Sequence, residues 1–164
     1  PIHIRWSTTT TRETLQIAAH ACAALDKNTD LLLANQYYSL AGPCTEMCLL
    51  EVAAQAMTDT ASGRELISGV ASSKGVMQDK TTGMEARMMG EVAQSAAGWE
   101  VEEINKVLDK LVGLYERDFS HAPAGKRFQE CYDLDSITPS NEYLAIFDRA
   151  KRTIGRCGLE MDRF

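Results

Sequence analysis

The sequence has 164 residues, of which 45% are hydrophobic and 24% are charged, a composition typical of one globular domain with a sizeable core. Its formal net charge is -6, and its 17 basic residues are scattered among 23 acidic ones, which argues against a nucleic-acid-binding surface. No apolar run approaches the roughly 20 residues of a membrane-spanning helix, and we expect neither a signal peptide nor a membrane partner.

The N-terminal third predicts two strands and a helix between them. Ile2–Trp6 alternates apolar and polar residues, as a strand does. Thr10 and Glu13 have the spacing of a capping box that opens a helix. The apolar face of this helix is Leu15, Ala18, Cys22 and Leu25. The run Leu31–Leu33 then begins a second strand.

The middle of the chain continues the alternation of helix and strand. Gly42-Pro43 opens a second helix, which Gly63 closes. Residues 66–70 predict a short third strand, and the polar residues 72–75 follow it. Thr82 and Glu85 form another capping box and lead a helix to Ala97.

The C-terminal part predicts helices only. Helical spacing is clearest between Val101 and Tyr115, and Thr138-Pro139 has the signature of a helix start. The stripe behind that start is Tyr143, Ile146, Phe147 and Ala150. Three strand–helix units followed by helices predict an α/β fold with parallel strands, too short to close an eight-stranded barrel of about 250 residues.

The second strand ends in Asn35-Gln36-Tyr37-Tyr38, that is, in two amides and two phenols. This is unusual, because a fully buried parallel strand is normally apolar throughout. In α/β folds, ligands bind at the carboxyl ends of strands. Gln36 and Tyr38 lie two residues apart and share a face, so they are the candidate catalytic residues. The alternative is a strand end whose amide and phenol satisfy nearby backbone groups. Ser7–Thr11 and Ser72–Lys74 are hydroxyl-rich segments at similar strand ends.

The remaining reactive residue types predict no catalyst. The five cysteines are an odd number in mostly apolar contexts, typical of buried, reduced thiols in a cytoplasmic protein. Cys44 and Cys48 have the spacing of one helix face, but no further ligand follows at zinc-site spacing, so we expect no metal. Glu46 and Glu51 are expected on a helix surface. Because the chain begins at Pro1, we interpret it as a trimmed or fragmentary product.

Several longer blocks resemble the monomethylamine methyltransferases of methylotrophic methanogens. The blocks are Asn35–Tyr38, Ala41–Glu51, Asp59–Glu65, Asp79–Glu91 and Ala122–Lys126, with His3–Trp6 and Thr11–Leu15 nearer the N-terminus. The resemblance runs over essentially the whole chain.

The resemblance implies the C-terminal part of a (β/α)8 TIM-type barrel with extra C-terminal helices. Residues 1–98 would supply three β/α units, and residues 99–164 a helical extension packed on the barrel. The family moves a methyl group from monomethylamine to the cobalt of a cognate corrinoid protein and forms homo-oligomers. This chain would bind no cofactor directly, and would act with the corrinoid cofactor of its partner.

In the family, an amide and a phenol near the pyrrolysine ring fall on Gln36 and Tyr38. Pyrrolysine and the family's acidic partner of the amine lie upstream of the matching portion, so we expect this chain alone to be inactive. Two alternatives remain. One is a non-catalytic scaffold that docks the corrinoid protein through the helices at 101–115 and 143–150. The other is a cysteine-based zinc methyltransferase.

Overall fold

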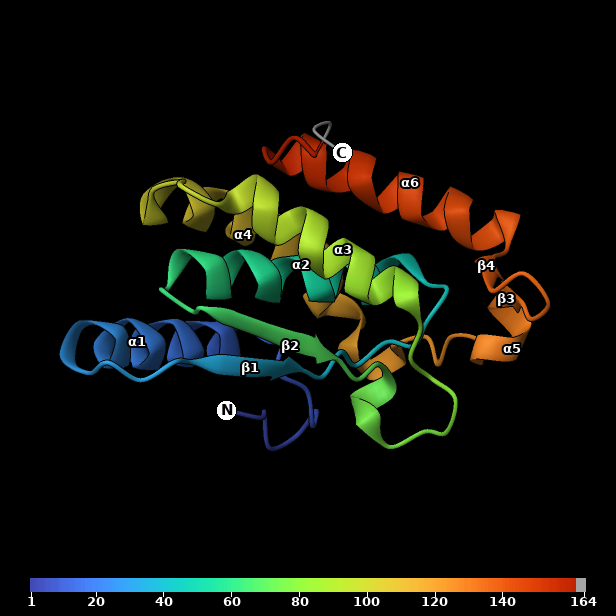
Figure 1. Ribbon diagram of the computed structural model, residues 1–164, viewed down its shortest axis with the longest axis horizontal. Coiled ribbons are helices and arrows are strands. Elements are labelled where there is room, and N and C mark those ends of the chain that lie inside the picture. Colours follow the sequence, from blue (N-terminus) through green and yellow to red (C-terminus); the bar gives the residue numbers. More distant parts are fainter. Residues whose placement is uncertain (162–164) are drawn as a thin grey trace.

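The computed structural model describes residues 1–161 and shows a mixed helix and sheet fold (Figure 1). The elements in chain order are α1 (Arg12–Asn28), β1 (Ala34–Tyr37), α2 (Glu46–Ala61), β2 (Leu66–Val70), the 3-10 turn η1 (Ser73–Gly75), α3 (Gly83–Ala96), α4 (Val101–Tyr115), the 3-10 helix η2 (Glu116–His121), α5 (Phe128–Cys131), β3 (Tyr132–Asp133), β4 (Thr138–Pro139) and α6 (Asn141–Cys157). None of the helices in residues 1–161 is long and apolar enough to cross a membrane.

The sheet that matters for function is the parallel pair β1–β2. Ala34 pairs with Leu66 and Tyr37 with Val70, and the register shifts between Asn35 and Gln36. This parallel pairing with α2 as its crossover confirms the predicted α/β character. The short strands β3 and β4 form a separate antiparallel hairpin near the start of α6.

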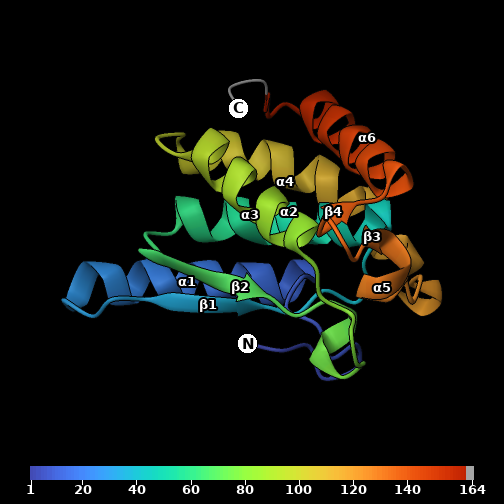
Figure 2. The ribbon, with the colours of Figure 1, turned by 45° about the vertical axis from the view of Figure 1, so that its right-hand side comes forward.

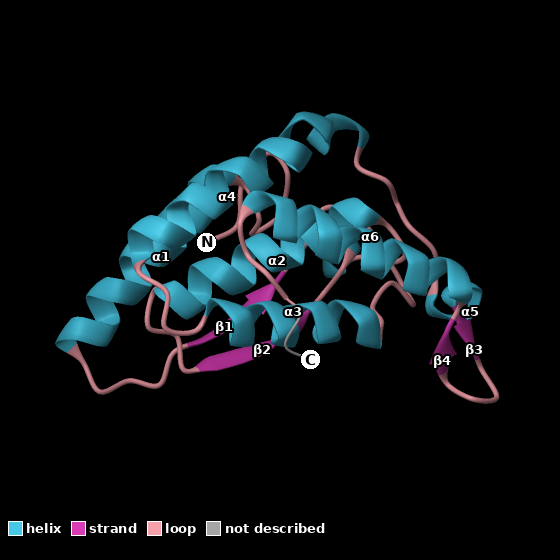
Figure 3. Ribbon diagram, turned by 90° about the horizontal axis from the view of Figure 1, so that it is seen from above, coloured by secondary structure: helices cyan, strands magenta, loops and turns pink. Residues whose placement is uncertain are grey.

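Helix α2 is the centre of the fold. It lies between the β1–β2 sheet and the layer of α3, α4 and α6, as Figures 1 and 2 show. Viewed from above, α4 and α3 flank it on either side (Figure 3). Every residue from Cys48 to Asp59 is buried, so α2 is enclosed on all sides rather than amphipathic. No α-helix of residues 1–161 lies below the sheet in Figures 1 and 2, so no α-helix of the described chain covers that face of β1–β2.

The two amphipathic helices predicted in the C-terminal part are confirmed. In α4 the buried residues are Ile104, Val107, Leu111, Val112 and Tyr115. In α6 the predicted stripe of Tyr143, Ile146, Phe147 and Ala150 is buried as well. These side chains belong to the same core cluster as the apolar residues of α2, so α4 and α6 pack directly against the helix that covers the sheet.

Two of the predicted helix boundaries are confirmed in atomic detail. Thr82 and Glu85 form a reciprocal capping box at the start of α3, in which the Thr82 N–H donates to Glu85 Oε2 at 2.6 Å. Gly63 follows the end of α2 with φ +81°, a left-handed conformation that favours glycine.

The predicted strand at Ile2–Trp6 is wrong. The segment forms turns, in which the Ser7 N–H donates to the His3 carbonyl at 2.7 Å and His3 Nδ1 accepts from Arg5 N–H at 3.2 Å. Ile4 is 99% exposed, so the alternating pattern buries nothing here. Two of the three predicted strands are therefore present in the parallel sheet of the described residues. The second of them begins at Ala34, so the predicted start at Leu31–Leu33 is wrong: Leu31 and Leu32 are 60% and 75% exposed and lie before the strand.

Three helix starts are also displaced from their predicted positions. The helix predicted to open at Gly42-Pro43 begins at Glu46, and Thr45 caps it by accepting from the Cys48 N–H at 3.3 Å. At the other two starts, the cap is a hydroxyl near the predicted one. Thr11, not Thr10, caps α1, accepting from the Thr14 N–H at 3.2 Å. Ser140, not Thr138, caps α6, accepting from the Tyr143 N–H at 3.2 Å, while Thr138 and Pro139 form β4. In both cases a neighbouring hydroxyl lies one or two residues closer to the first helical turn and satisfies its free N–H groups.

Candidate functional site

The side chains of β1 divide between two faces. On one face, Asn35 Nδ2 donates to Asp59 Oδ2 on α2 at 2.8 Å, and Tyr37 is fully buried. Because strand side chains alternate, Gln36 and Tyr38 project to the other face, where both are half-buried. The structure therefore brings the two predicted site residues together on the face of the sheet turned away from α2.

A bulge in β2 lies directly opposite Gln36. Gln36 pairs with Gly69 and Asn35 with Ile67, so Ser68 is the extra residue. Its hydroxyl donates to the Asn35 carbonyl at 2.5 Å and lies 3.4 Å from Gln36 Oε1. Bulges commonly redirect side chains beside functional sites. Sequence reasoning missed Ser68, although a glycine inside a short strand was an available signal.

The ring of Tyr38 lies against a left-handed turn. Ser73, Lys74 and Gly75 have φ of 54°, 64° and 69° in succession, separated from the end of β2 by two residues. A Cβ added to Gly75 would lie 3.0 Å from Tyr38 Cε1, and 3.2 Å from the Ala71 Cβ. Backbone strain of this kind concentrates at functional sites. The turn therefore places a residue without a side chain next to the phenol.

The main chain of Tyr38 is held by the N-terminal segment. Thr9 N–H donates to the Tyr38 carbonyl at 3.0 Å, and Tyr38 N–H donates to Thr9 Oγ1 at 2.9 Å. The Thr8 hydroxyl donates to the same carbonyl. The hydroxyl-rich segment 7–11 does not follow a strand at Ile2–Trp6, as predicted, but lies beside the end of β1, where it binds protein atoms.

The first two residues after Ser39 are fixed by a buried carboxylate. Glu51 is fully buried on α2 and accepts from the N–H of Leu40 at 2.7 Å and of Ala41 at 2.9 Å, as well as from the Thr10 hydroxyl. Burial raises the pKa of Glu51 to about 7, although these three hydrogen bonds oppose the shift. The expectation that Glu51 lies on the helix surface is wrong. Glu46, in contrast, lies at the edge, bonded to Arg149 and Thr153 on α6.

The rim beside these strand ends is closed by the loop at residues 122–126. Gly42 N–H donates to the Pro123 carbonyl at 2.9 Å, and Lys126 N–H donates to the Pro43 carbonyl at 2.9 Å. A Cβ on Gly42 would lie 1.9 Å from the Ala124 oxygen, so only glycine permits this approach. Buried Lys80 donates to the Ala124 carbonyl at 2.9 Å and to the Gly125 carbonyl, which ties the segment after β2 into the same rim.

The cysteines do not assemble a reactive site. Cys44 precedes α2, with φ +59°, so it does not share a helix face with Cys48 as predicted. The Cys48 thiol lies between Ser39 Oγ at 3.3 Å and Ser72 Oγ at 3.5 Å, and burial raises its pKa well above the usual value. All five cysteines are free and buried. Among residues 1–161 no group of three or more His, Cys, Asp or Glu side chains is placed to hold a metal ion.

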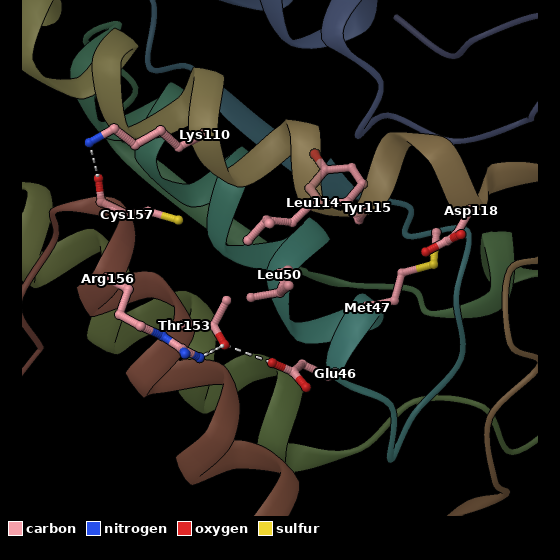
Figure 4. Close-up of a pocket in the computed structure, with 10 residues that line it drawn as sticks. All are labelled: Glu46, Met47, Leu50, Lys110, Leu114, Tyr115, Asp118, Thr153, Arg156 and Cys157. Atoms are coloured by element: carbon pink, nitrogen blue, oxygen red, sulfur yellow. Dashed lines mark hydrogen bonds between the residues drawn. The ribbon is translucent and has the colours of Figure 1, made fainter.

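A cleft lies elsewhere, between α2, α4 and α6 (Figure 4). Its volume is about 630 Å³, and its lining mixes apolar residues such as Leu50 and Leu114 with charged ones. Both basic groups are already engaged: Arg156 donates to Thr153 Oγ1 at 3.1 Å and Lys110 to the Cys157 carbonyl at 3.3 Å. Neither Gln36 nor Tyr38 lines this cleft. We place the candidate site at the strand ends because ligands of α/β folds bind at the carboxyl ends of parallel strands.

Comparison with known proteins gives one consistent family. The family model described as monomethylamine methyltransferase MtmB matches residues 1–159. The chain is 64% identical over 159 residues to monomethylamine methyltransferase MtmB1 of Methanosarcina acetivorans, and 63% identical to MtmB of Methanosarcina mazei. In both cases the match covers 97% of this chain and 35% of the relative.

Solved structures agree with the sequence comparisons. The crystal structure of the Methanosarcina barkeri monomethylamine methyltransferase superposes with a TM-score of 0.96 at 62% identity, over 97% of this chain and 35% of that one. A crystal structure of the hydroxylamine MtmB complex gives the same values. The chain thus spans about a third of the length of these relatives and belongs to the monomethylamine methyltransferase MtmB family.

Proposed function

We propose that this chain is part of an enzyme that transfers the methyl group of monomethylamine to the cobalt of a cognate corrinoid protein. Gln36 and Tyr38 are its contribution to the substrate pocket. Family membership over residues 1–159 supports the reaction class. One solved relative is a hydroxylamine complex, and hydroxylamine is a small nitrogen compound similar in size to methylamine.

The observation that carries the site assignment is that the two side chains have unused hydrogen-bonding capacity. Gln36 Oε1 lies 3.4 Å from the Ser68 hydroxyl, a long contact, and among residues 1–161 neither Gln36 Nε2 nor the Tyr38 hydroxyl has a hydrogen-bond partner. If these side chains only stabilised the strand end, they would form hydrogen bonds with nearby backbone groups. Half-buried donors left available on an open sheet face are suited to binding a polar substrate.

The chemical task of the two residues is positioning and proton control. An amine is a poor leaving group, so methyl transfer needs the amine attached to an electrophile, which we assign to a pyrrolysine in another part of the enzyme. The corrinoid cobalt of the partner supplies the methyl acceptor. The Gln36 carboxamide would hold the nitrogen by hydrogen bonds, and the Tyr38 phenol would donate or accept a proton beside it.

The same proposal includes the architecture of the whole enzyme. The parallel β1–β2 pair has α-helices on one side only. This is expected of two neighbouring strands of a (β/α)8 barrel whose remaining strands lie outside this chain. Residues 1–98 would then belong to the C-terminal part of the barrel and residues 99–164 to a helical extension. We also propose a homo-oligomer, and we expect the chain by itself to be inactive.

The test uses the full-length enzyme that carries this sequence. Gln36→Ala and Tyr38→Phe should each reduce methylation of the corrinoid protein by about 10- to 100-fold, the usual range for positioning and acid–base groups. Matched controls are Gln94→Ala on the exposed side of α3 and Tyr132→Phe, which lies beside α5. Unchanged rates in well-folded Gln36 and Tyr38 variants would contradict the site assignment.

A further inference from the structure

Two polar side chains of α2 lie inside the core, next to the end of β1. Glu51 is fully buried and Gln55 is 2% exposed, and they are four residues apart, so they share one face of the helix. The neighbouring core positions of α2, including Leu50, Val52 and Ala54, are apolar. Burying a carboxylate and an amide is costly unless hydrogen bonds compensate it, so their partners indicate what these residues are for.

The partners of Glu51 are two backbone N–H groups that follow Tyr38 and the hydroxyl of Thr10. Glu51 Oε2 accepts from the Leu40 N–H at 2.7 Å and from the Thr10 hydroxyl, and Oε1 accepts from the Ala41 N–H at 2.9 Å. Leu40 and Ala41 are the second and third residues after Tyr38. One carboxylate therefore holds both the segment that leaves β1 and the threonine segment that lies beside it.

Gln55 completes the same network one helical turn further along. Thr9 Oγ1 donates to Gln55 Oε1 at 2.5 Å and accepts from the Tyr38 N–H at 2.9 Å. The Thr8 hydroxyl donates to the Tyr38 carbonyl and lies 2.8 Å from Thr10 Oγ1. Both polar main-chain groups of Tyr38 are thus bonded to threonines that α2 holds in place.

We propose that Glu51, assisted by Gln55, is a positioning residue that sets the location of the Tyr38 phenol for methyl transfer. The inference rests on the function proposed above. Glu51 is too deeply buried to touch the substrate, and it acts through Leu40, Ala41 and the threonine segment. A leucine at this position would fill the space but would leave three buried donors without an acceptor.

The experiment introduces Glu51→Gln into the full-length enzyme, with Glu85→Gln as the matched control. Three donors converge on the two oxygens of Glu51, and a carboxamide replaces one of these oxygens with a donor. Glu85 is also a fully buried glutamate, but it bonds to Thr82 and Tyr143, away from the strand ends. Any loss of stability common to buried glutamates appears in both variants.

Two measurements distinguish positioning from a general structural role. Fluorotyrosine is incorporated, the Tyr38 resonance is assigned by its absence in Tyr38→Phe, and its ¹⁹F shift is recorded. The kcat and KM for monomethylamine are measured on the same samples. We expect Glu51→Gln to move the Tyr38 resonance and to lower kcat by about 10- to 100-fold, as a displacement near 1 Å does. Glu85→Gln should leave both values unchanged.

If Glu51→Gln does not fold, Thr9→Val replaces it, with Thr9→Ser as the conservative variant that keeps the hydroxyl. The valine variant should move the Tyr38 resonance and lower kcat, and the serine variant should restore both. A folded Glu51→Gln or Thr9→Val enzyme with an unmoved resonance and normal kcat overturns the inference. A moved resonance together with a fully active Tyr38→Phe enzyme overturns instead the proposed role of Tyr38.

Discussion

Asn35 and Asp59 are joined by a hydrogen bond of 2.8 Å, so the first amide of the Asn35–Tyr38 block has a structural role. Asp59 also accepts from Arg64 Nε at 2.9 Å, and Arg64 Nη1 donates to the Ala34 carbonyl at 3.0 Å. Both charged side chains are largely buried. The amide of Asn35 therefore fastens β1 to α2, whereas the amide of Gln36 remains available on the other face.

This division predicts unequal effects on stability when the two amides are removed. Asn35→Ala removes a donor from a buried carboxylate and should lower the free energy of unfolding by about 1–3 kcal/mol. Gln36→Ala, which removes no short hydrogen bond, should change it by at most about 0.5 kcal/mol. Urea denaturation of both variants at neutral pH measures the difference. Equal destabilisation would show that Gln36 is a structural residue.

The glycine at position 42 predicts a sharp contrast with another glycine of the same chain. Gly42→Ala forces a methyl group to within 1.9 Å of the Ala124 oxygen and should destabilise the protein by about 1–3 kcal/mol. Gly90, inside α3, has no atom within 4 Å of an added Cβ. Gly90→Ala should stabilise by about 0.5–1 kcal/mol through its better helix propensity. Thermal unfolding should lower Tm in the first variant and raise it in the second.

Glu85 predicts a specific pH dependence of stability. Burial raises its pKa from the ordinary 4.5 to about 7, and the Tyr143 hydroxyl donates to it. Between these pH values the folded protein keeps a proton that the unfolded chain has lost, so this group makes stability fall as pH rises through that range. Glu85→Gln removes the effect and retains acceptor and donor groups for Thr82 and Tyr143.

Denaturation of the wild type and Glu85→Gln at several pH values between 5 and 8 provides the measurement. As the pH rises toward 7, the free energy of unfolding of the variant should increase relative to that of the wild type by up to about 1.4 kcal/mol per pH unit. Above pH 7 the difference should stay constant. A constant difference between the two proteins across the range would mean that Glu85 titrates normally.

The cysteines predict slow thiol chemistry. All five are buried, and burial raises the pKa of each one, so little thiolate is present near neutral pH. In the native chain a thiol reagent should react slowly at pH 8, and all five should react after unfolding. A cysteine placed on the exposed side of α3 by Gln94→Cys provides the fast control. Rapid native reaction at Cys44 would reopen the cysteine-based alternative.

Sequence patterns predicted those elements whose stability is encoded locally. The capping box of Thr82 and Glu85 needs only two side chains at fixed spacing, and the stripe from Ile104 to Tyr115 needs only helical periodicity. Both appear as expected. The opposite faces of Asn35 and Gln36 follow from short-range alternation for the same reason. The apolar run Leu31–Leu33, in contrast, predicted the start of its strand three residues too early.

The failures arise where distant segments decide the outcome. Ile2–Trp6 alternates correctly but finds no partner strand among residues 1–161, so it turns instead. A glutamate is normally a surface residue, and Glu51 lies in the core only because α2 is enclosed on all sides. The apolar residues that surround it within α2 were a usable signal, because a helix without a polar face leaves no surface for a charge.

The approach of Gly42 to Ala124 also has a consequence for the order in which the protein is built. During synthesis β1, α2 and β2 leave the ribosome before the loop at residues 122–126, which follows α3 and α4 in the chain. Gly42 and Lys80 cannot find their carbonyl partners until that loop has emerged. The sheet and its central helix are therefore synthesised early, whereas the rim beside the strand ends is completed only after α3 and α4 have been translated.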